Sequence, residues 1–517
     1  MSKLRPKGAN RRAAASGSPA GLQNYLKEIE KAFRRGDASE RTHYPALKDL
    51  LESLEPHPTA TVEPRRTQCG VPDFIVTKDP RTIGYIEAKD VGEDLDKWQK
   101  SDQLRRYLPA LANLILTNFL EFRWFTDGEL RAKARIGAAD SHGKIVPDVA
   151  GMEQAAHLLG DFMAHRVPSV GTPKELALRM ARMAHMIRDI IIEVFRVEPR
   201  AGNLHSQYEA FKESLLPALS PEEFADMYAQ TIAYGLFAAR VEWPGGKASF
   251  TRLNAAQHLP KTNPFLQKFF YDITGPDLDD RIAWLVDDLA QLLQDAAMEE
   301  ILKDFGRRLG KEDPVVHFYE TFLAAYDPKL REVRGVYYTP EPVVSYIVRS
   351  IDLILKREFG YALGLADPKV MILDPACGTG TFLYAAIRLI HETVRREGRL
   401  GTWNDYVEKH LLPRLFGFEL LMAPYTVAHL KLATLLKEFG YEFQSDQRLG
   451  VYLTNTLEEA AKKADVLLAR FIAEESDAAG AHQVEAHHGG DGESALLRTF
   501  RERQHAGGGG SQDREDA

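Results

Sequence analysis

Three residues in the first quarter of the chain have types and spacing suited to hydrolytic chemistry: Asp73, Glu87 and Lys89. Two apolar runs, Asp73–Thr77 and Thr82–Ala88, predict neighbouring strands. Because side chains alternate along a strand, Glu87 and Lys89 share one face, and Asp73 can converge with them from the strand beside it. Two carboxylates suit Mg²⁺, which prefers hard oxygen ligands and retains waters. The cluster therefore predicts a magnesium site formed by Asp73 and Glu87, with Lys89 orienting or deprotonating a water that attacks a phosphodiester.

A second candidate site is a glycine-bearing turn in the C-terminal half, Leu373–Leu383 (LDPACGTGTFL). The turn follows an apolar strand and leads into a helix, so its glycines let the backbone approach a ligand. The amides at the helix start favour a carboxylate or a phosphate. The dinucleotide fingerprint G-x-G-x-x-G is absent at this turn. The candidate cofactor-binding residues here are Asp374, Pro375, Ala376, Gly378, Gly380 and Phe382.

This turn resembles motif I of the N6-adenine DNA methyltransferases, which binds S-adenosylmethionine. The resemblance implies that the upstream segment GVYYTP covers the methionine end of the cofactor with Tyr338, Thr339 and Pro340. The strand ending in Glu419 is suited to accept hydrogen bonds from ribose hydroxyls. Asn455 resembles the third-strand position beside the adenine ring. The alternative for Glu419 is an ordinary carboxylate at a solvent-exposed strand end. For Asn455, a role beside the adenine ring and no role in binding both stay open.

The first cluster is similar to the core of PD-(D/E)XK nucleases, in which a Pro-Asp pair precedes an acidic-x-Lys strand. Gln103 and Tyr107 form the Q-x-x-x-Y pair that such nucleases often have near modification enzymes, which implies a catalytic role for Gln103. Glu40 lies where related nucleases place a further helix carboxylate. The alternatives are that Glu87-x-Lys89 is a solvated strand face and that Glu40 is an ordinary carboxylate at a helix start.

The nuclease-like residues need a compact α/β module to position them. Apolar periodicity predicts helix from Leu22 to Leu54, and a polar helix is expected over Asp94–Leu108. The runs Asn113–Thr117 and Glu121–Phe125 predict a further strand pair. The module is expected to end near Ile136.

The rest of the chain divides into a helical region and a strand–helix region. Residues 152–330 are helical in pattern, and in Pro221–Val241 apolar residues four apart predict a buried face. From there on, apolar runs at Val370–Leu373, Leu415–Glu419 and Tyr452–Leu453 alternate with helical stretches. This alternation predicts the start of a parallel, doubly wound sheet.

The predicted fold is therefore multidomain, α/β plus α, with a Rossmann-like class I methyltransferase that is incomplete. The expected parts are a basic disordered arm (1–21), a nuclease-like domain (22–150), a helical connector (151–330), the N-terminal half of a methyltransferase (331–475) and a disordered tail (476–517). This order resembles single-chain type IIG restriction-modification enzymes and type ISP enzymes without their helicase. No Walker A motif occurs.

The sequence departs from that family at one point. The tetrapeptide [D/N/S]-P-P-[Y/F], which holds the target adenine, does not occur after the third strand. We expect a chain truncated near Glu475, with methyl transfer impaired. The alternative is an intact protein whose partner chain supplies the missing half and the target-recognition domain.

The expected function is site-specific adenine-N6 methylation of double-stranded DNA with a fused Mg²⁺-dependent endonuclease. A stand-alone nuclease with a regulatory cofactor-binding remnant, and a non-enzymatic DNA-binding or assembly subunit, are the alternatives. The net charge of −8 excludes none of them. Two distant cysteines, Cys69 and Cys377, fit a reducing cytoplasm, and no apolar run is long enough to span a membrane.

Overall fold

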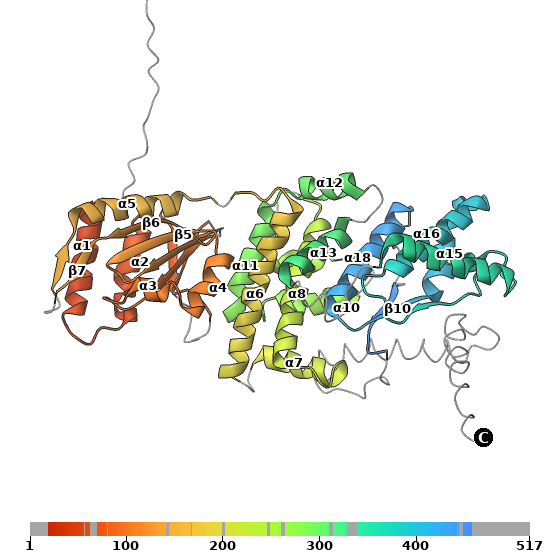
Figure 1. The fold of residues 1–517 in the computed structure, drawn as a ribbon, viewed down its shortest axis with the longest axis horizontal. Helices are drawn as coiled ribbons and strands as arrows, with labels where there is room; N and C mark the ends of the chain where they lie inside the picture. The colour runs from red at the N-terminus through yellow and green to blue at the C-terminus, as the bar shows by residue number, and fades with distance from the viewer. Residues whose placement is uncertain are drawn as a thin grey trace, which may run out of the picture. The chain divides into compact units, whose positions relative to one another are not determined.

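The chain folds into two compact units, residues 1–169 and 170–517, in a computed structural model (Figure 1). The structure describes residues 19–55, 57–62, 70–79, 81–140, 144–166, 168–198, 202–245, 249–259, 264–309, 314–327, 339–441, 443 and 448–456. The predicted tail, most of the predicted basic arm, and Cys69 lie outside these residues. None of the described helices is long and apolar enough to cross a membrane.

The N-terminal unit is built on a six-stranded sheet whose strands follow sequence order. All neighbours are antiparallel except β3 and β4, which run parallel and are joined by helices. The β-like runs of the sequence are confirmed as strands. The strands are β1 (Thr59–Val62), β2 (Phe74–Lys78), β3 (Arg81–Ala88), β4 (Asn113–Thr117), β5 (Glu121–Thr126) and β6 (Glu129–Arg135).

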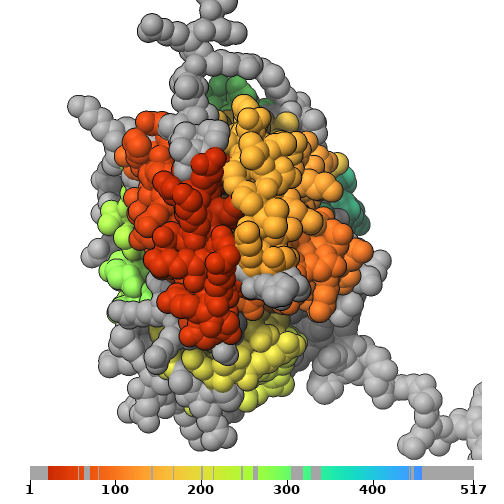
Figure 2. Space-filling view, turned by 90° about the vertical axis from the view of Figure 1, so that its left-hand side faces the viewer, coloured from red at the N-terminus to blue at the C-terminus, as the bar shows by residue number. Residues whose placement is uncertain are grey.

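One face of this sheet carries the main hydrophobic core of the unit. Alternate strand residues such as Ile86, Ile115 and Phe122 pack there against apolar residues of three helices. These are α1 (Pro19–Phe33), α2 (Tyr44–Glu52) and α5 (Val149–Ala164). Figure 2 shows α1 in red and α5 in amber side by side on this side of the unit.

The crossover between β3 and β4 contains two helices where the sequence predicted one over Asp94–Leu108. They are α3 (Leu95–Trp98) and α4 (Asp102–Ala110). Ser101 separates them, because its side chain caps α4 by accepting a hydrogen bond from the Leu104 amide at 3.3 Å. The single-helix prediction was therefore wrong at this point.

The N-terminal unit also extends past its predicted end near Ile136. A short hairpin, β7 (Gly137–Ala139) and β8 (Ile145–Pro147), leads into α5. Leu158, Leu159 and Phe162 of α5 belong to the same core as the sheet. The division of the chain after Ser169 consequently leaves α5 with the N-terminal unit, although it lies within the predicted connector.

The next part of the chain is helical, as predicted. At its centre lies α8 (Pro221–Val241), in which every side chain from Phe224 to Ala239 is buried. The sequence predicted burial of one face, whereas packing on all sides makes α8 a core helix. Packed against it are α6 (Pro173–Val197), α9 (Arg252–Ala255), η2 (Ala256–His258), α10 (Pro264–Thr274) and α11 (Asp280–Asp295). The other helices of this part are α7 (Asn203–Ser214), α12 (Met298–Leu309) and α13 (Pro314–Tyr326).

The last described part is a three-stranded parallel sheet in the order β11-β10-β9, as expected for the start of a doubly wound fold. Its strands are β9 (Ile372–Asp374), β10 (Leu415–Glu419) and β11 (Gly450–Leu453). The major helices are α15 (Glu341–Arg357), α16 (Thr381–Arg396) and α18 (Met422–Glu438). Short turns complete it: η3 (Gly364–Ala366), η4 (Leu400–Thr402), α17 (Trp403–Tyr406), η5 (Val407–Leu411) and η6 (Leu412–Arg414).

Candidate functional site

The structure brings Asp73, Glu87 and Lys89 together at the end of β3. The Ala88 amide donates a 2.7 Å hydrogen bond to Asp73 Oδ2, which holds the two strand ends together. Lys89 Nζ donates to Glu87 Oε1. The Lys89 amide donates to the Thr117 carbonyl at 2.8 Å, so the backbone at the lysine stays paired with β4. The predicted convergence of these three side chains is present.

Gln103 joins this cluster through Lys89. Its Oε1 lies 3.4 Å from Lys89 Nζ, and its Nε2 donates to the Tyr107 hydroxyl at 3.3 Å. Gln103 and Tyr107 are one turn apart on α4, so both face the end of β3. The amide of Gln103 therefore links the buried tyrosine to the lysine.

Tyr44 is a site residue that the sequence analysis missed. Its hydroxyl lies 2.5 Å from Glu40 Oε1 and 2.5 Å from Asp73 Oδ1. The ring packs edge-on against Phe74 at 5.0 Å and is buried. Glu40 is thereby tied to the cluster through Tyr44, and the four-residue spacing of the two residues was the available signal.

Burial dominates the electrostatics of this cluster. Glu87 is 2% exposed, and burial together with the charge of Asp73 raises its pKa to about 8. Burial raises the pKa of Asp73 and of Glu40 as well. For Lys89, burial opposes the charged form, but the charge and hydrogen bond of Glu87 together with the charges of Asp73 and Glu40 outweigh it, so the pKa is raised. Three acidic groups face one ammonium, so a further cation would be favoured here.

The donor set fits a hard cation that keeps most of its waters. Glu87 Oε2 is buried and has no hydrogen-bond partner among the described residues. No group of three or more His, Cys, Asp and Glu arranged to hold a metal occurs in the described part of the chain. Mg²⁺ is commonly bound through one or two carboxylates, so Asp73 and Glu87 match its requirements.

The second site is built mainly from backbone. After β9 the chain turns through Gly378 and Gly380, whose φ angles are +53° and +73°, a region that favours glycine. A Cβ at Gly378 would meet no atom within 4 Å, whereas one at Gly380 would lie 3.2 Å from the Ala428 Cβ. The Cys377 amide donates to the Phe418 carbonyl at 2.9 Å, which fixes the turn against β10. Space for a ligand is therefore open beside Gly378.

Two carboxylates flank this turn. Asp374 Oδ1 accepts from the Ala376 amide at 3.3 Å, while its buried Oδ2 has no partner among the described residues. Glu419 Oε2 accepts from the Gly378 amide at 2.9 Å, and its Oε1 accepts from the Leu420 and Leu421 amides. Burial raises the pKa of both carboxyls. Glu419 thus shapes the turn, and its Oε2 retains a lone pair for a hydroxyl donor.

The other predicted cofactor residues are placed less uniformly. Pro375 and Ala376 are exposed, and Phe382 is half-buried near the start of α16. Thr456 Oγ1 donates to the Pro375 carbonyl at 2.7 Å, which brings the end of β11 to the turn.

The remaining four predicted cofactor residues lie away from the turn or outside the residues that the structure describes. Asn455 Nδ2 lies 3.5 Å from the Leu215 carbonyl, a contact made outside the turn. Thr339 and Pro340 lead into α15, where the Pro340 carbonyl accepts from the Val343 amide at 2.8 Å. Tyr338 lies outside the described residues.

Comparison with solved structures gives likenesses of low identity. A DrdV–DNA complex has 22% identity and a TM-score of 0.41, covering 90% of this chain and 42% of that one. The ATP-dependent type ISP restriction-modification enzyme LlaBIII bound to DNA has 17% identity and a TM-score of 0.44, covering 64% of this chain and 21% of that one. The chain thus spans less than half of either protein.

Comparison of sequences gives a match over the second site only. No curated protein matches the chain. The family model described as N-6 DNA Methylase matches residues 310–471, a stretch that includes β9, the glycine turn, β10 and β11. This match supports the resemblance of this part of the chain to DNA methyltransferases. Residues 310–471 are therefore similar to the N-6 DNA Methylase family.

Proposed function

We propose that this chain is part of a DNA restriction-modification enzyme in which a Mg²⁺-dependent PD-(D/E)XK nuclease precedes an adenine-N6 methyltransferase. The observation that carries the nuclease is the buried cluster of Asp73, Glu87 and Lys89, in a unit separate from the methylase domain. The methylase match supports the other half of the proposal.

In the nuclease, each residue of the cluster has a distinct task. Asp73 and Glu87 would hold the cation, which when bound lowers the pKa of a water and offsets charge on the phosphate. Lys89, held by Glu87 and Gln103, would orient the attacking water by donating a hydrogen bond to it from its ammonium group. Tyr44 and the Ala88 amide keep Asp73 turned toward the cluster. Double-stranded DNA is the proposed substrate.

In the methylase domain, the turn would hold S-adenosylmethionine, which when bound supplies the methyl group. The open side of Gly378 would admit the cofactor, and Asp374 Oδ2, which has no partner among the described residues, would accept a hydrogen bond from its amino group. Glu419 Oε2, which accepts from the Gly378 amide, would also accept from a ribose hydroxyl. The residues after β11 contain no [D/N/S]-P-P-[Y/F] tetrapeptide, the element that would hold the target adenine.

Three measurements separate the functions. Calorimetry with S-adenosylmethionine tests the turn, and a folded sample that gives no heat contradicts cofactor binding. Cleavage of unmethylated double-stranded DNA with Mg²⁺, lost in Asp73→Ala and Lys89→Ala, supports the nuclease. Transfer of a radiolabelled methyl group to DNA distinguishes a methyltransferase from a cofactor-binding regulator. A chain that binds DNA but neither cleaves nor methylates it is a non-enzymatic subunit.

A further inference from the structure

Lys89 has a neighbour that the proposed chemistry does not use. The ring of Trp98 lies 4.7 Å from Lys89 Nζ, within the range of a cation–π contact. Lys89 is 8% exposed, and its four-carbon stem has many rotamers. Glu87 and Gln103 contact the ammonium through its N–H groups, whereas the indole offers it an aromatic face. The position of Nζ therefore depends on Trp98 as well as on the two polar partners.

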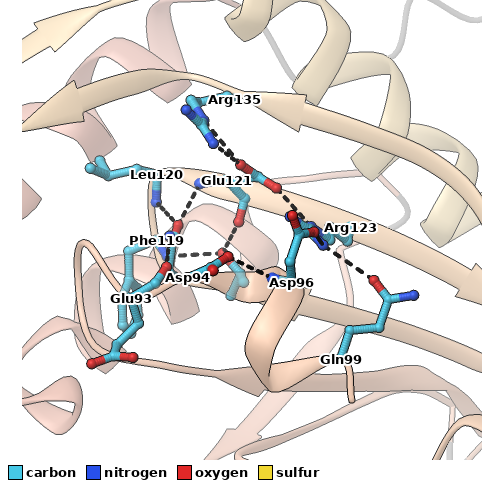
Figure 3. A network of polar contacts seen from close by, with 11 residues as sticks. Glu93, Asp94, Asp96, Gln99, Phe119, Leu120, Glu121, Arg123 and Arg135 are labelled. Carbon is cyan, nitrogen blue, oxygen red and sulfur yellow. Dashed lines mark hydrogen bonds and ion pairs between the residues drawn. The ribbon is translucent and has the colours of Figure 1, made fainter. Parts of the chain in front are cut away.

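Trp98 is carried by α3, which is only one turn long. Asp94 caps it by accepting from the Asp96 amide at 2.9 Å. A helix of this length is not stable by itself, so tertiary contacts must hold it. Arg123 on β5 provides these contacts: its Nη1 donates to Asp96 Oδ1 at 2.6 Å and to Gln99 Oε1 at 3.2 Å, as Figure 3 shows. The Arg123 guanidinium thus binds residues on both sides of Trp98 and holds this helical turn in place.

Arg123 is itself held rigidly. Its Nε donates to Glu121 Oε1 at 2.7 Å, and Arg135 on β6 donates to Glu121 Oε2 from its Nε at 3.0 Å (Figure 3). Arg123 and Glu121 are 8% and 6% exposed, and buried charges persist only when paired and hydrogen-bonded.

The sheet links this network to the site. Glu87 pairs with Leu116, and Leu116 pairs with Arg123. Residues directly opposite each other on neighbouring strands share a face of the sheet, so Arg123 lies on the same face as Glu87. Arg123, which holds α3, and Glu87 of the cluster therefore lie side by side across the strands on one face of the sheet.

We propose that Trp98 is a positioning residue that keeps the Lys89 ammonium between Glu87 and Gln103, and that Arg123 fixes Trp98 there through α3. This inference rests on the proposed nuclease function. The ring restricts the lysine to rotamers that keep Nζ beside the carboxylate. Such preorganisation affects the chemical step more than DNA binding.

The test compares substitutions that keep or remove the aromatic ring. In Trp98→Phe the ring remains, and we expect kcat for DNA cleavage within about twofold of the unaltered chain. In Trp98→Leu the bulk remains without the ring, and we expect kcat to fall about threefold to tenfold with KM for DNA unchanged. Trp243→Leu, the same change at a half-buried tryptophan of the other unit, is the matched control and should leave kcat unchanged. Equal kcat values for Trp98→Phe and Trp98→Leu would overturn the inference.

The anchoring step has its own test. Arg123→Lys keeps a charge for Glu121 but cannot reach Asp96 and Gln99 together, so kcat should fall as in Trp98→Leu. If Arg123 acts through Trp98, the double variant should be no slower than Trp98→Leu alone. Losses that multiply would show that Arg123 does not act through the indole.

A readout without catalysis separates this inference from the proposed function. Replacing Lys89 by Met removes the ammonium and should change tryptophan emission, and this change should vanish in the Trp98→Phe background. If the unaltered chain fails to cleave DNA with Mg²⁺, the nuclease proposal fails, and the emission experiment alone decides the Lys89–Trp98 contact. An emission change that persists without Trp98 overturns that contact.

Discussion

The two sites of this chain are built from different materials. The N-terminal site consists of buried ionisable side chains: Lys89 donates to Glu87, the Ala88 amide donates to Asp73, and Glu87 Oε2 has no hydrogen-bond partner among the described residues. The C-terminal site is a backbone turn, in which glycine conformations and three amides around Glu419 set the shape. Substitutions that remove a charged side chain should inactivate the N-terminal site, whereas substitutions that replace a glycine, and so add a Cβ, should disrupt the C-terminal site. Each kind of substitution should therefore affect one site and spare the other.

The largest expected effect is on DNA cleavage. Asp73→Ala or Lys89→Ala should lower Mg²⁺-dependent cleavage on the order of a thousandfold, because the charge arrangement for the cation and water is lost. Calorimetry should show unchanged S-adenosylmethionine binding. Asp102→Ala, which alters a carboxylate with a 95% exposed side chain on α4, is the control and should cleave normally. Loss of cofactor binding in Asp73→Ala would contradict the separation of the sites.

The next largest effect distinguishes the two glycines of the turn. Gly378→Ala places a methyl group in space open to a ligand, so the affinity for S-adenosylmethionine should fall about tenfold or more. Gly380→Ala instead presses on Ala428 and should mainly lower the melting temperature. Both variants should cleave DNA normally. Equal loss of stability with unchanged cofactor affinity in the two variants would contradict a ligand site beside Gly378.

A smaller effect is expected from the tyrosine hydroxyl that the sequence did not reveal. Tyr44→Phe removes the contact to Asp73 Oδ1 and should lower cleavage about tenfold, because the carboxylate is less firmly oriented. Tyr25→Phe also removes a buried hydroxyl, which donates to the Phe119 carbonyl at 3.0 Å away from the cluster. Thermal melting should show similar losses for both variants. Unchanged cleavage in Tyr44→Phe would remove Tyr44 from the site.

The smallest effect is a difference in pH dependence between the units. Burial raises the pKa of Glu87 from 4.5 to about 8, so the folded N-terminal unit holds a proton that the unfolded chain releases. Its stability is therefore lost as pH rises through that interval. Burial lowers the pKa of His429 from 6.5 to about 3, so the C-terminal unit loses stability as pH falls through that interval.

Thermal melting in the absence of metal checks this difference. The transition of the N-terminal unit should shift down by a few °C on raising the pH, and that of the C-terminal unit on lowering it. Glu87→Gln and His429→Gln identify the transitions, since each should flatten the pH dependence of its own unit. If the melting temperatures of both units changed in the same direction with pH, the pKa shifts assigned to Glu87 and His429 would be contradicted.

The sequence predicted the parts of both sites that depend on local order along the chain. The strands around Asp73 and Glu87 and the strand–turn–helix at Gly378 follow from alternation and from glycine spacing. Tyr44 and Arg123 could not be predicted in the same way, because their roles depend on contacts across 29 and 27 positions of sequence. The division of the crossover into α3 and α4 depended on one serine cap, which a helical pattern conceals. The nuclease fold itself stays a prediction.

Asn113 has a consequence for anyone who wishes to express the N-terminal unit alone. Its buried amide donates to the Ile83 carbonyl on β3 and to the Phe162 carbonyl near the end of α5, at 2.8 and 3.1 Å. Phe162 also fills the space left by the missing side chain of Gly84. A fragment that ended at Ile136 would lack α5, so the apolar face of the sheet would be exposed to water. Any useful cut has to fall between Ala164 and Val170.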